Sequence, residues 1–181
     1  MDLSIQTLVF PLINRYSRQF FELECNDIFV RFLYDSGAKM PVWCRGTEKF
    51  MITFPEAEKL DMNCQISGFG KGREKAEAYM IPSFCLDDGS KKFVIERLVV
   101  ALLDKPYIGC DFLISETMFS KVDTFTYRRE KRELHIVGED RLYHCTVRQH
   151  GDEVLDITVW TQEEMVSLEN DLTTEGRLPQ N

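Results

Sequence analysis

Short apolar segments separated by turn signals run through almost the whole of this 181-residue chain. They are a few residues long, rich in Val, Ile, Phe and Tyr, and bounded by Gly, Pro, Asn or Asp. This is the pattern of β-strands and hairpins. The 13 Phe and 6 Tyr residues supply bulky side chains that suit a pleated core. The length is enough for one domain with a real core, so we expect a mainly β protein.

The strand-like segments follow one another as hairpins. One pair of strands meets at Asn26-Asp27, a second flanks the glycine-rich residues 68–72, a third turns at 128–132 and a fourth at 150–152. Asn, Asp and Gly favour such turns because they tolerate positive φ angles. The segment FLISETMF, which begins at Phe112, is expected to start as a strand and to continue as a short helix.

One strand-like segment ends in an acid. Residues 28–34 are mostly apolar and run directly into Asp35-Ser36-Gly37-Ala38. Taken alone, Asp-Ser-Gly is an ordinary turn sequence. The apolar approach makes it unusual, because it would draw the carboxylate toward the interior, where an uncompensated charge is costly.

The order of four segments resembles the retropepsin-like aspartic proteases. In that family an apolar strand enters Asp-Thr/Ser-Gly-Ala, a glycine-rich flap follows, two apolar residues and a Gly open a short helix, and a further strand closes the domain. Here the parts read FLYDSGA, ISGFGKG, FLISETMFSKV and DTFTYRREKRELHI, roughly between Phe20 and Ile136. The resemblance implies a closed β-barrel of the acid protease fold, with one short helix and a flap hairpin. Residues beyond 140 would add a C-terminal β-hairpin.

The resemblance also assigns roles residue by residue. They comprise a catalytic acid, the loop that carries it, a flap that covers the substrate, and a second loop before the helix. In that order the residues are Asp35; Ser36, Gly37 and Ala38; Ile66, Ser67, Gly68, Phe69 and Gly70; and Leu113, Ile114 and Ser115.

Two positions depart from the family pattern. Ser115 stands where the family has Gly; the nearby Tyr107-Ile108-Gly109 has the right residue types but leaves too many residues before the closing strand. Many members also pair an acid after Asp-Thr-Gly-Ala with an Arg after the later Gly. Lys39 and Glu116 occupy those two positions with the signs reversed, so we predict a Lys39–Glu116 salt bridge.

A single aspartate motif implies two chains. Aspartic proteolysis uses two carboxylates that share one proton, and the reversed sequence Asp87-Asp88-Gly89-Ser90 reads as a plain turn. The resemblance therefore implies a homodimeric aspartic endopeptidase in which Asp35 of both subunits activates a water to hydrolyse peptide bonds, with no cofactor and no metal.

Two other functions stay open. A catalytically weak or inactive binding or dimerisation module of the same fold is the main alternative, and Ser115 favours it. A protease that acts only on its own chain or on one dedicated partner is the third.

Charge and motif spacing disfavour other classes. The net charge of −8 argues against a nucleic acid or an anionic membrane as partner. Gly68, Gly70 and Gly72 fit neither phosphate-loop pattern. No apolar run reaches the length of a membrane span, and the N-terminus lacks the order of a secretion signal. We therefore expect a cytoplasmic protein.

A metal site is suggested only by proximity in sequence. His135, His144 and His150 lie near Cys145, but His144 and Cys145 are neighbours on an expected strand and would point to opposite faces. Ordinary strand histidines are the favoured interpretation.

The six cysteines are widely spaced and form no CxxC pair. Without a secretion signal they are expected to be free, buried thiols. Reactive nucleophiles at Cys44, Cys64 or Cys110 are disfavoured because no His lies near them in sequence.

We expect three parts along the chain. Residues 1–140 form the retropepsin-like domain, and 141–162 form the additional hairpin, packed on the domain or at the dimer interface with Trp160 as a candidate anchor. Residues 163–181 form an acidic tail that is helical in part or flexible.

Overall fold

The computed structural model describes residues 5–15, 18–35, 40–67, 73–103, 110–119, 122, 124–128, 130–150, 153–161, 164 and 167. In chain order the elements are β1 (Ile5–Pro11), β2 (Ile13–Arg15), β3 (Arg18–Cys25), β4 (Ile28–Asp35), β5 (Val42–Trp43), α1 (Thr47–Thr53), β6 (Glu58–Ser67), β7 (Arg73–Asp87), β8 (Lys92–Leu102), β9 (Phe112–Ser115), the 3-10 turn η1 (Glu116–Phe119), β10 (Thr124–Arg128), β11 (Glu133–Glu139), β12 (Arg141–His150) and β13 (Glu153–Thr161). The prediction of a mainly β protein is confirmed.

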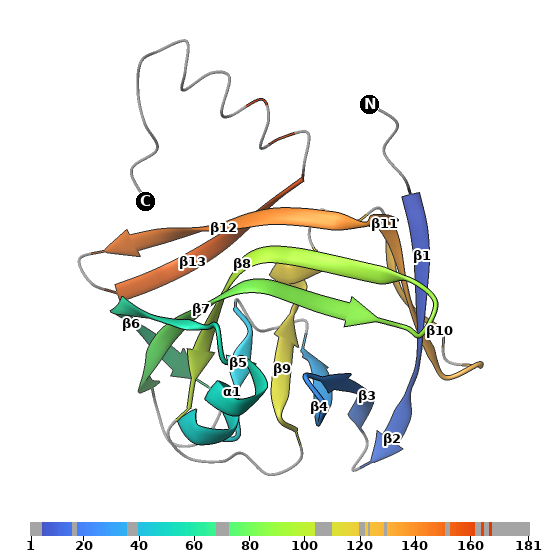
Figure 1. The fold of residues 1–181 in the computed structure, drawn as a ribbon, viewed down its shortest axis with the longest axis horizontal. Coiled ribbons are helices and arrows are strands. Elements are labelled where there is room, and N and C mark those ends of the chain that lie inside the picture. Colours follow the sequence, from blue (N-terminus) through green and yellow to red (C-terminus); the bar gives the residue numbers. More distant parts are fainter. Residues whose placement is uncertain are drawn as a thin grey trace.

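The strands form two sheets (Figure 1). The smaller has the order β1-β11-β10, and the larger has the mixed order β12-β13-β6-β7-β8-β5-β9-β4-β3-β2. β12 also pairs with β8, so one end of the larger sheet folds back on itself. The described pairings do not join the two sheets into the single closed barrel that the resemblance implied.

Aromatic side chains fill the core beneath β4 and β9. Phe32 is fully buried and stacks on Phe21 and Phe112, with ring centroids 5.0 Å and 5.5 Å apart. Phe84 of β7 closes the same cluster, 5.5 Å from Phe112. Such pairs stabilise a core beyond the area that they bury. The larger sheet thus packs its central strands around Phe rings, as the composition suggested.

The turns follow the local sequence closely. Asn26 and Asp27 have φ angles of 50° and 64° and join β3 to β4, so the predicted hairpin is confirmed. β10 and β11 also form the predicted hairpin around residues 128–132. Asp87-Asp88-Gly89-Ser90 is the plain turn that was expected, between β7 and β8.

The helix α1 was not predicted. A short helix was expected after Ser115, where the structure has only η1, and no element was predicted for Thr47–Thr53. Phe50 is fully buried on α1, and the indole ring of Trp43 meets it edge-on at 5.6 Å. The Trp43 N–H donates to the carbonyl of Gly46 at 2.9 Å, just before the helix. The helix is therefore held mainly by aromatic packing.

Strand β8 changes partner along its length. Its residues Val94–Glu96 pair with β12, whereas Ala101 and Leu102 pair with β5. Between these two stretches Arg97 has a φ of 62°, and the register places it opposite Pro82 of β7. β7 pairs with β8 on both sides of Arg97, so the left-handed residue marks the point at which the partner on the other edge of β8 changes from β12 to β5.

The C-terminal strands β12 and β13 pair with each other in an antiparallel arrangement, and β13 also runs alongside β6. The division of the chain after residue 140, and an interface role for Trp160, stay predictions. Within 163–181 only Glu164 and Ser167 belong to the described residues. No helix among the described residues is long and apolar enough to cross a membrane.

Candidate active site

Asp35 is the last residue of a buried strand. β4 brings Val30, Phe32 and Leu33 into the core and then ends at the acid. β9 lies beside β4 in parallel, and the pairing runs without a shift from Phe32 and Phe112 to Asp35 and Ser115. The two strands therefore end side by side.

The chain crosses over at this point. β5 pairs with β9 in the antiparallel sense, on the edge of β9 that faces away from β4. β4 and β5 are joined directly in sequence, so the connection that follows Asp35 links strands on opposite sides of β9. From Asp35 the chain goes on to β5, whereas from Ser115 it goes on to η1.

The predicted site residues fall partly within this arrangement. Leu113, Ile114 and Ser115 form β9 together with Phe112, next to the end of β4. Ile66 and Ser67 end β6 and pair with Glu74 and Arg73 of β7. The remaining predicted residues lie outside the described part of the chain: Ser36, Gly37, Ala38, Gly68, Phe69 and Gly70. The roles given to all of these residues stay predictions.

The predicted Lys39–Glu116 salt bridge also lies outside the described residues, because the placement of Lys39 and of the Glu116 side chain is not described. The same holds for Tyr107-Ile108-Gly109.

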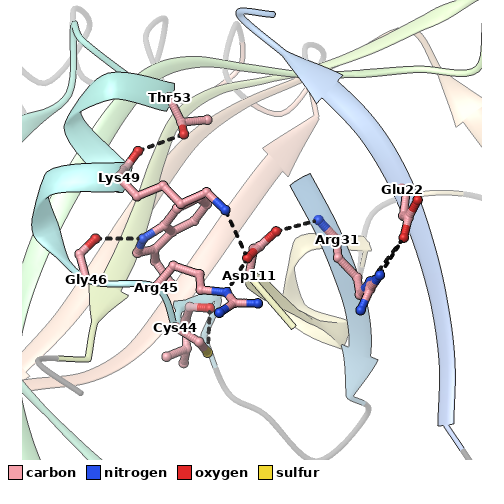
Figure 2. A network of polar contacts seen from close by, with 10 residues as sticks. Glu22, Arg31, Cys44, Arg45, Gly46, Lys49, Thr53 and Asp111 are labelled. Atoms are coloured by element: carbon pink, nitrogen blue, oxygen red, sulfur yellow. Dashed lines mark hydrogen bonds and ion pairs between the residues drawn. The ribbon is translucent and has the colours of Figure 1, made fainter. Parts of the chain in front are cut away.

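A buried carboxylate lies at the other end of the β4–β9 pair, and it was not among the predicted site residues. Asp111 comes directly before β9, and its side chain is 7% exposed. One carboxylate oxygen accepts the backbone N–H of Arg31 at 2.9 Å. The other faces Nε of Arg45 at 2.5 Å and Nζ of Lys49 at 3.3 Å (Figure 2). The network therefore ties β4, the segment between β5 and α1, and α1 itself to the start of β9.

The surroundings of Asp111 keep it ionised. Burial alone would raise the pKa of its carboxyl group, but the Arg31 N–H and the positive charges of Arg45 and Lys49 together lower that pKa. Asp111 could have been noticed in the sequence by the feature that singled out Asp35, an acid beside an apolar strand. Nothing in the sequence near Asp111 indicates that Arg31, Arg45 and Lys49 converge on its carboxylate.

The thiols near this network are poor nucleophiles. Cys44 and Cys110 are both buried, and a hydrogen bond between them, together with burial, raises the pKa of the Cys44 thiol. The prediction that the cysteines are free is confirmed for the five described ones. The expectation of burial was wrong for two of them, since Cys85 is exposed and Cys25 is half-buried.

Two other features carry no site. Among the described residues no group of three or more His, Cys, Asp or Glu side chains could hold a metal ion. A cavity of about 260 Å³ lies between the β3–β4 turn at Asn26, the segment after α1 and residues 81–83 of β7. It sits at the start of β4, roughly 20 Å from Asp35 at about 3.3 Å per strand residue.

No protein-family model and no curated protein matches this sequence. A crystal structure of a retropepsin-like aspartic protease from Rickettsia conorii is similar to this chain, with 14% sequence identity and a TM-score of 0.48. The likeness covers 76% of this chain and 94% of that one.

Proposed function

We propose that this chain is an aspartic endopeptidase that acts as a homodimer, with Asp35 of each subunit forming the catalytic pair. The observation that carries the proposal is the parallel pairing of β4 with β9, which ends at Asp35 and Ser115. The carboxyl ends of neighbouring parallel strands from which the chain diverges are where crevices for ligands form. An acid at that point, at the end of an apolar strand, is suited to chemistry on a bound substrate.

The chemistry requires a second acid of the same kind. Two carboxylates a few ångströms apart cannot both ionise easily, so one proton is shared and the pair titrates as a unit. The ionised member takes a proton from a water, the water attacks the peptide carbonyl, and the protonated member donates to the oxyanion. One Asp-Ser-Gly motif per chain supplies one such acid, and a two-fold axis supplies the other.

The substrate would be an extended peptide. The antiparallel strands β6 and β7 lead into and out of residues 68–72, which are rich in glycine. A hairpin of this kind has the residue types needed to close over a peptide backbone, because glycine allows close approach.

The test compares two variants that make the same change. Asp35→Asn removes the proposed catalytic charge, whereas Asp27→Asn makes that substitution in the exposed β3–β4 turn, where Asn tolerates the positive φ. We expect a peptide-library digestion to show cleavage by wild type and Asp27→Asn and a loss of at least about a thousandfold in Asp35→Asn. Cleavage that persists in Asp35→Asn would refute the mechanism, and a strictly monomeric active species would refute the dimer.

The alternative is a binding or dimerisation module of the same fold. The observation in its favour is that a serine, Ser115, is the cross-strand neighbour of Asp35. A pepstatin-like transition-state analogue separates the two functions, since an active dyad binds it and raises the Tm. A dimer with no cleavage and no change in Tm would favour the module. Ser115→Gly then shows whether the serine is the cause, because the glycine variant should gain cleavage.

A further inference from the structure

Asp111 joins three separate parts of the chain through both its main chain and its side chain. Its backbone N–H donates to the carbonyl of Arg31 at 2.9 Å, and its carbonyl accepts the N–H of Cys44 at 2.8 Å. Its carboxylate accepts the N–H of Arg31 in return and pairs with Arg45 and Lys49. Figure 2 shows Arg31, Arg45 and Lys49 converging on the Asp111 side chain.

These bonds lie at a defined distance from the proposed site. Arg31 precedes Asp35 by four residues, and Asp111 precedes Ser115 by four residues. The exchange of bonds between Arg31 and Asp111 therefore holds the same register that later sets Ser115 beside Asp35. A slip of one residue would turn every side chain of β9 to the opposite face, so the register decides what faces the acid.

We infer that Asp111 is a positioning residue for the Asp35 site: it fixes the register of β9 on β4 and thereby selects the backbone that flanks Asp35. This rests on the function proposed above. Asp111 acts through the strands rather than through its charge. Four strand residues separate Asp111 from Ser115 by roughly 13 Å at about 3.3 Å each, and the positive charges of Arg45 and Lys49 offset the charge of Asp111 locally.

The contacts of Asp111 fit a residue that fixes the strand register better than one that only forms a stabilising ion pair. The carboxylate of Glu22 also forms an ion pair with Arg31, at 2.9 Å, but it contacts only the Arg31 side chain. The carboxylate of Asp111 instead accepts the main-chain N–H of Arg31, which is the part of β4 that sets the pairing. Arg45, in the segment after β5, and Lys49 of α1 then hold that carboxylate in place.

The experiment uses the full-length dimer and four forms of the chain: wild type, Asp111→Ala, Asp111→Asn and Asp88→Ala. Asp88 is the matched control, because its carboxylate also accepts backbone N–H bonds, but in the turn between β7 and β8. Two quantities are measured. One is amide hydrogen exchange at residues 34–35 and 113–115; the other is the pH profile of kcat/KM, normalised to active sites titrated with a pepstatin-like inhibitor.

We expect exchange at those amides to be at least tenfold faster in Asp111→Ala than in Asp88→Ala, and the apparent pKa values of the pH profile to shift only in the Asp111 variants. Asp111→Asn keeps one carbonyl acceptor and should show a smaller change in both; it carries the comparison alone if the alanine variant does not fold. A general loss of stability would speed exchange in both alanine variants and leave the normalised pH profile unchanged.

The outcomes separate this inference from the proposed function. Equal local exchange and an unchanged pH profile in Asp111→Ala and Asp88→Ala would overturn the positioning role while leaving the protease intact. Cleavage that persists in Asp35→Asn would overturn the proposed function, and the exchange data would still decide whether Asp111 sets the register.

Discussion

Truncating Phe50 tests whether aromatic packing holds α1 in place. Phe50 is fully buried, and its ring lies 5.6 Å from that of Trp43, 5.3 Å from that of Phe54 and 5.3 Å from that of Tyr79. Replacing a buried Phe by Ala costs about 3–5 kcal/mol, which includes the cavity left behind. Because three aromatic pairs are lost together, we expect Phe50→Ala to fall near the upper end, at about 5 kcal/mol.

A second residue of the same helix provides the control. Ile52 is 59% exposed, so Ile52→Ala removes apolar atoms that are mostly in contact with water. It should cost no more than about 0.5 kcal/mol. Both variants would be unfolded in urea and followed by circular dichroism, with the m-value checked for constancy. Similar costs for the two substitutions would show that α1 does not dock through Phe50 and would refute the reasoning.

Three further predictions concern single side chains. Asp111→Asn should make the fall in stability on acidification less steep. The pKa of Asp111 is lowered in the folded chain, so its carboxylate stabilises the fold above the unfolded pKa of about 3.9, and this stabilisation is lost as the pH falls from there through the folded pKa. Denaturant midpoints of both proteins between pH 6 and pH 2.5 check this, and parallel curves would contradict it. Burial opposes ionisation of Asp88, but hydrogen bonds from the backbone of Ser90, Val9 and Lys91 lower its pKa to about 2. Wild type should therefore lose stability between about pH 4 and pH 2 as Asp88 is protonated, and Asp88→Asn should remove that loss. Asp87→Asn, in the same turn, is the control. Arg97→Gly should raise the free energy of unfolding by about 0.5–1 kcal/mol, since glycine relieves the left-handed conformation at the cost of some chain entropy. Arg97→Val should lower the free energy of unfolding, because a β-branched residue tolerates a positive φ poorly. A less stable glycine variant and a more stable valine variant in urea melts would show that the backbone at Arg97 is unstrained.

Local sequence predicted the hairpins because their determinants are local. Asn26 and Asp27 tolerate the positive φ angles of a tight turn whatever the rest of the chain does. The charged turn between β10 and β11 was also predicted from its own residues, although there the positive φ, of 52°, belongs to Arg132. These elements could be predicted from a few residues each.

The helix α1 escaped prediction because its sequence carries mixed signals. Phe50, Met51, Ile52 and Thr53 read as the start of a strand, since aromatic and β-branched residues favour sheets. Their helical conformation depends on Trp43, which lies before the helix and packs against Phe50. Tertiary packing of this kind overrides local propensity and cannot be found from periodicity.

The neighbourhood of Asp35 was accessible only in part. The apolar approach to the acid was visible in the sequence, but the partner of β4 is β9, nearly eighty residues later. No local pattern specifies such a pairing. Asp111 shows the same limit, because the cation pair that compensates it comes from Arg45 and Lys49, far away in sequence.

The β4–β9 pair has an acid at each end, and their chemistry must differ. Burial opposes ionisation of Asp111, but it faces a backbone N–H and two cations, which lower its pKa and favour its charged form. Such a carboxylate cannot hold the shared proton that peptide hydrolysis requires, because a dyad depends on one raised pKa. The proposed function therefore assigns the dyad to Asp35 and not to Asp111. Asp111→Asn should still show a bell-shaped pH profile of kcat/KM, displaced from that of wild type, whereas Asp35→Asn should show no cleavage at any pH. A profile in Asp111→Asn that is no longer bell-shaped, with Asp35 intact, would reverse this assignment.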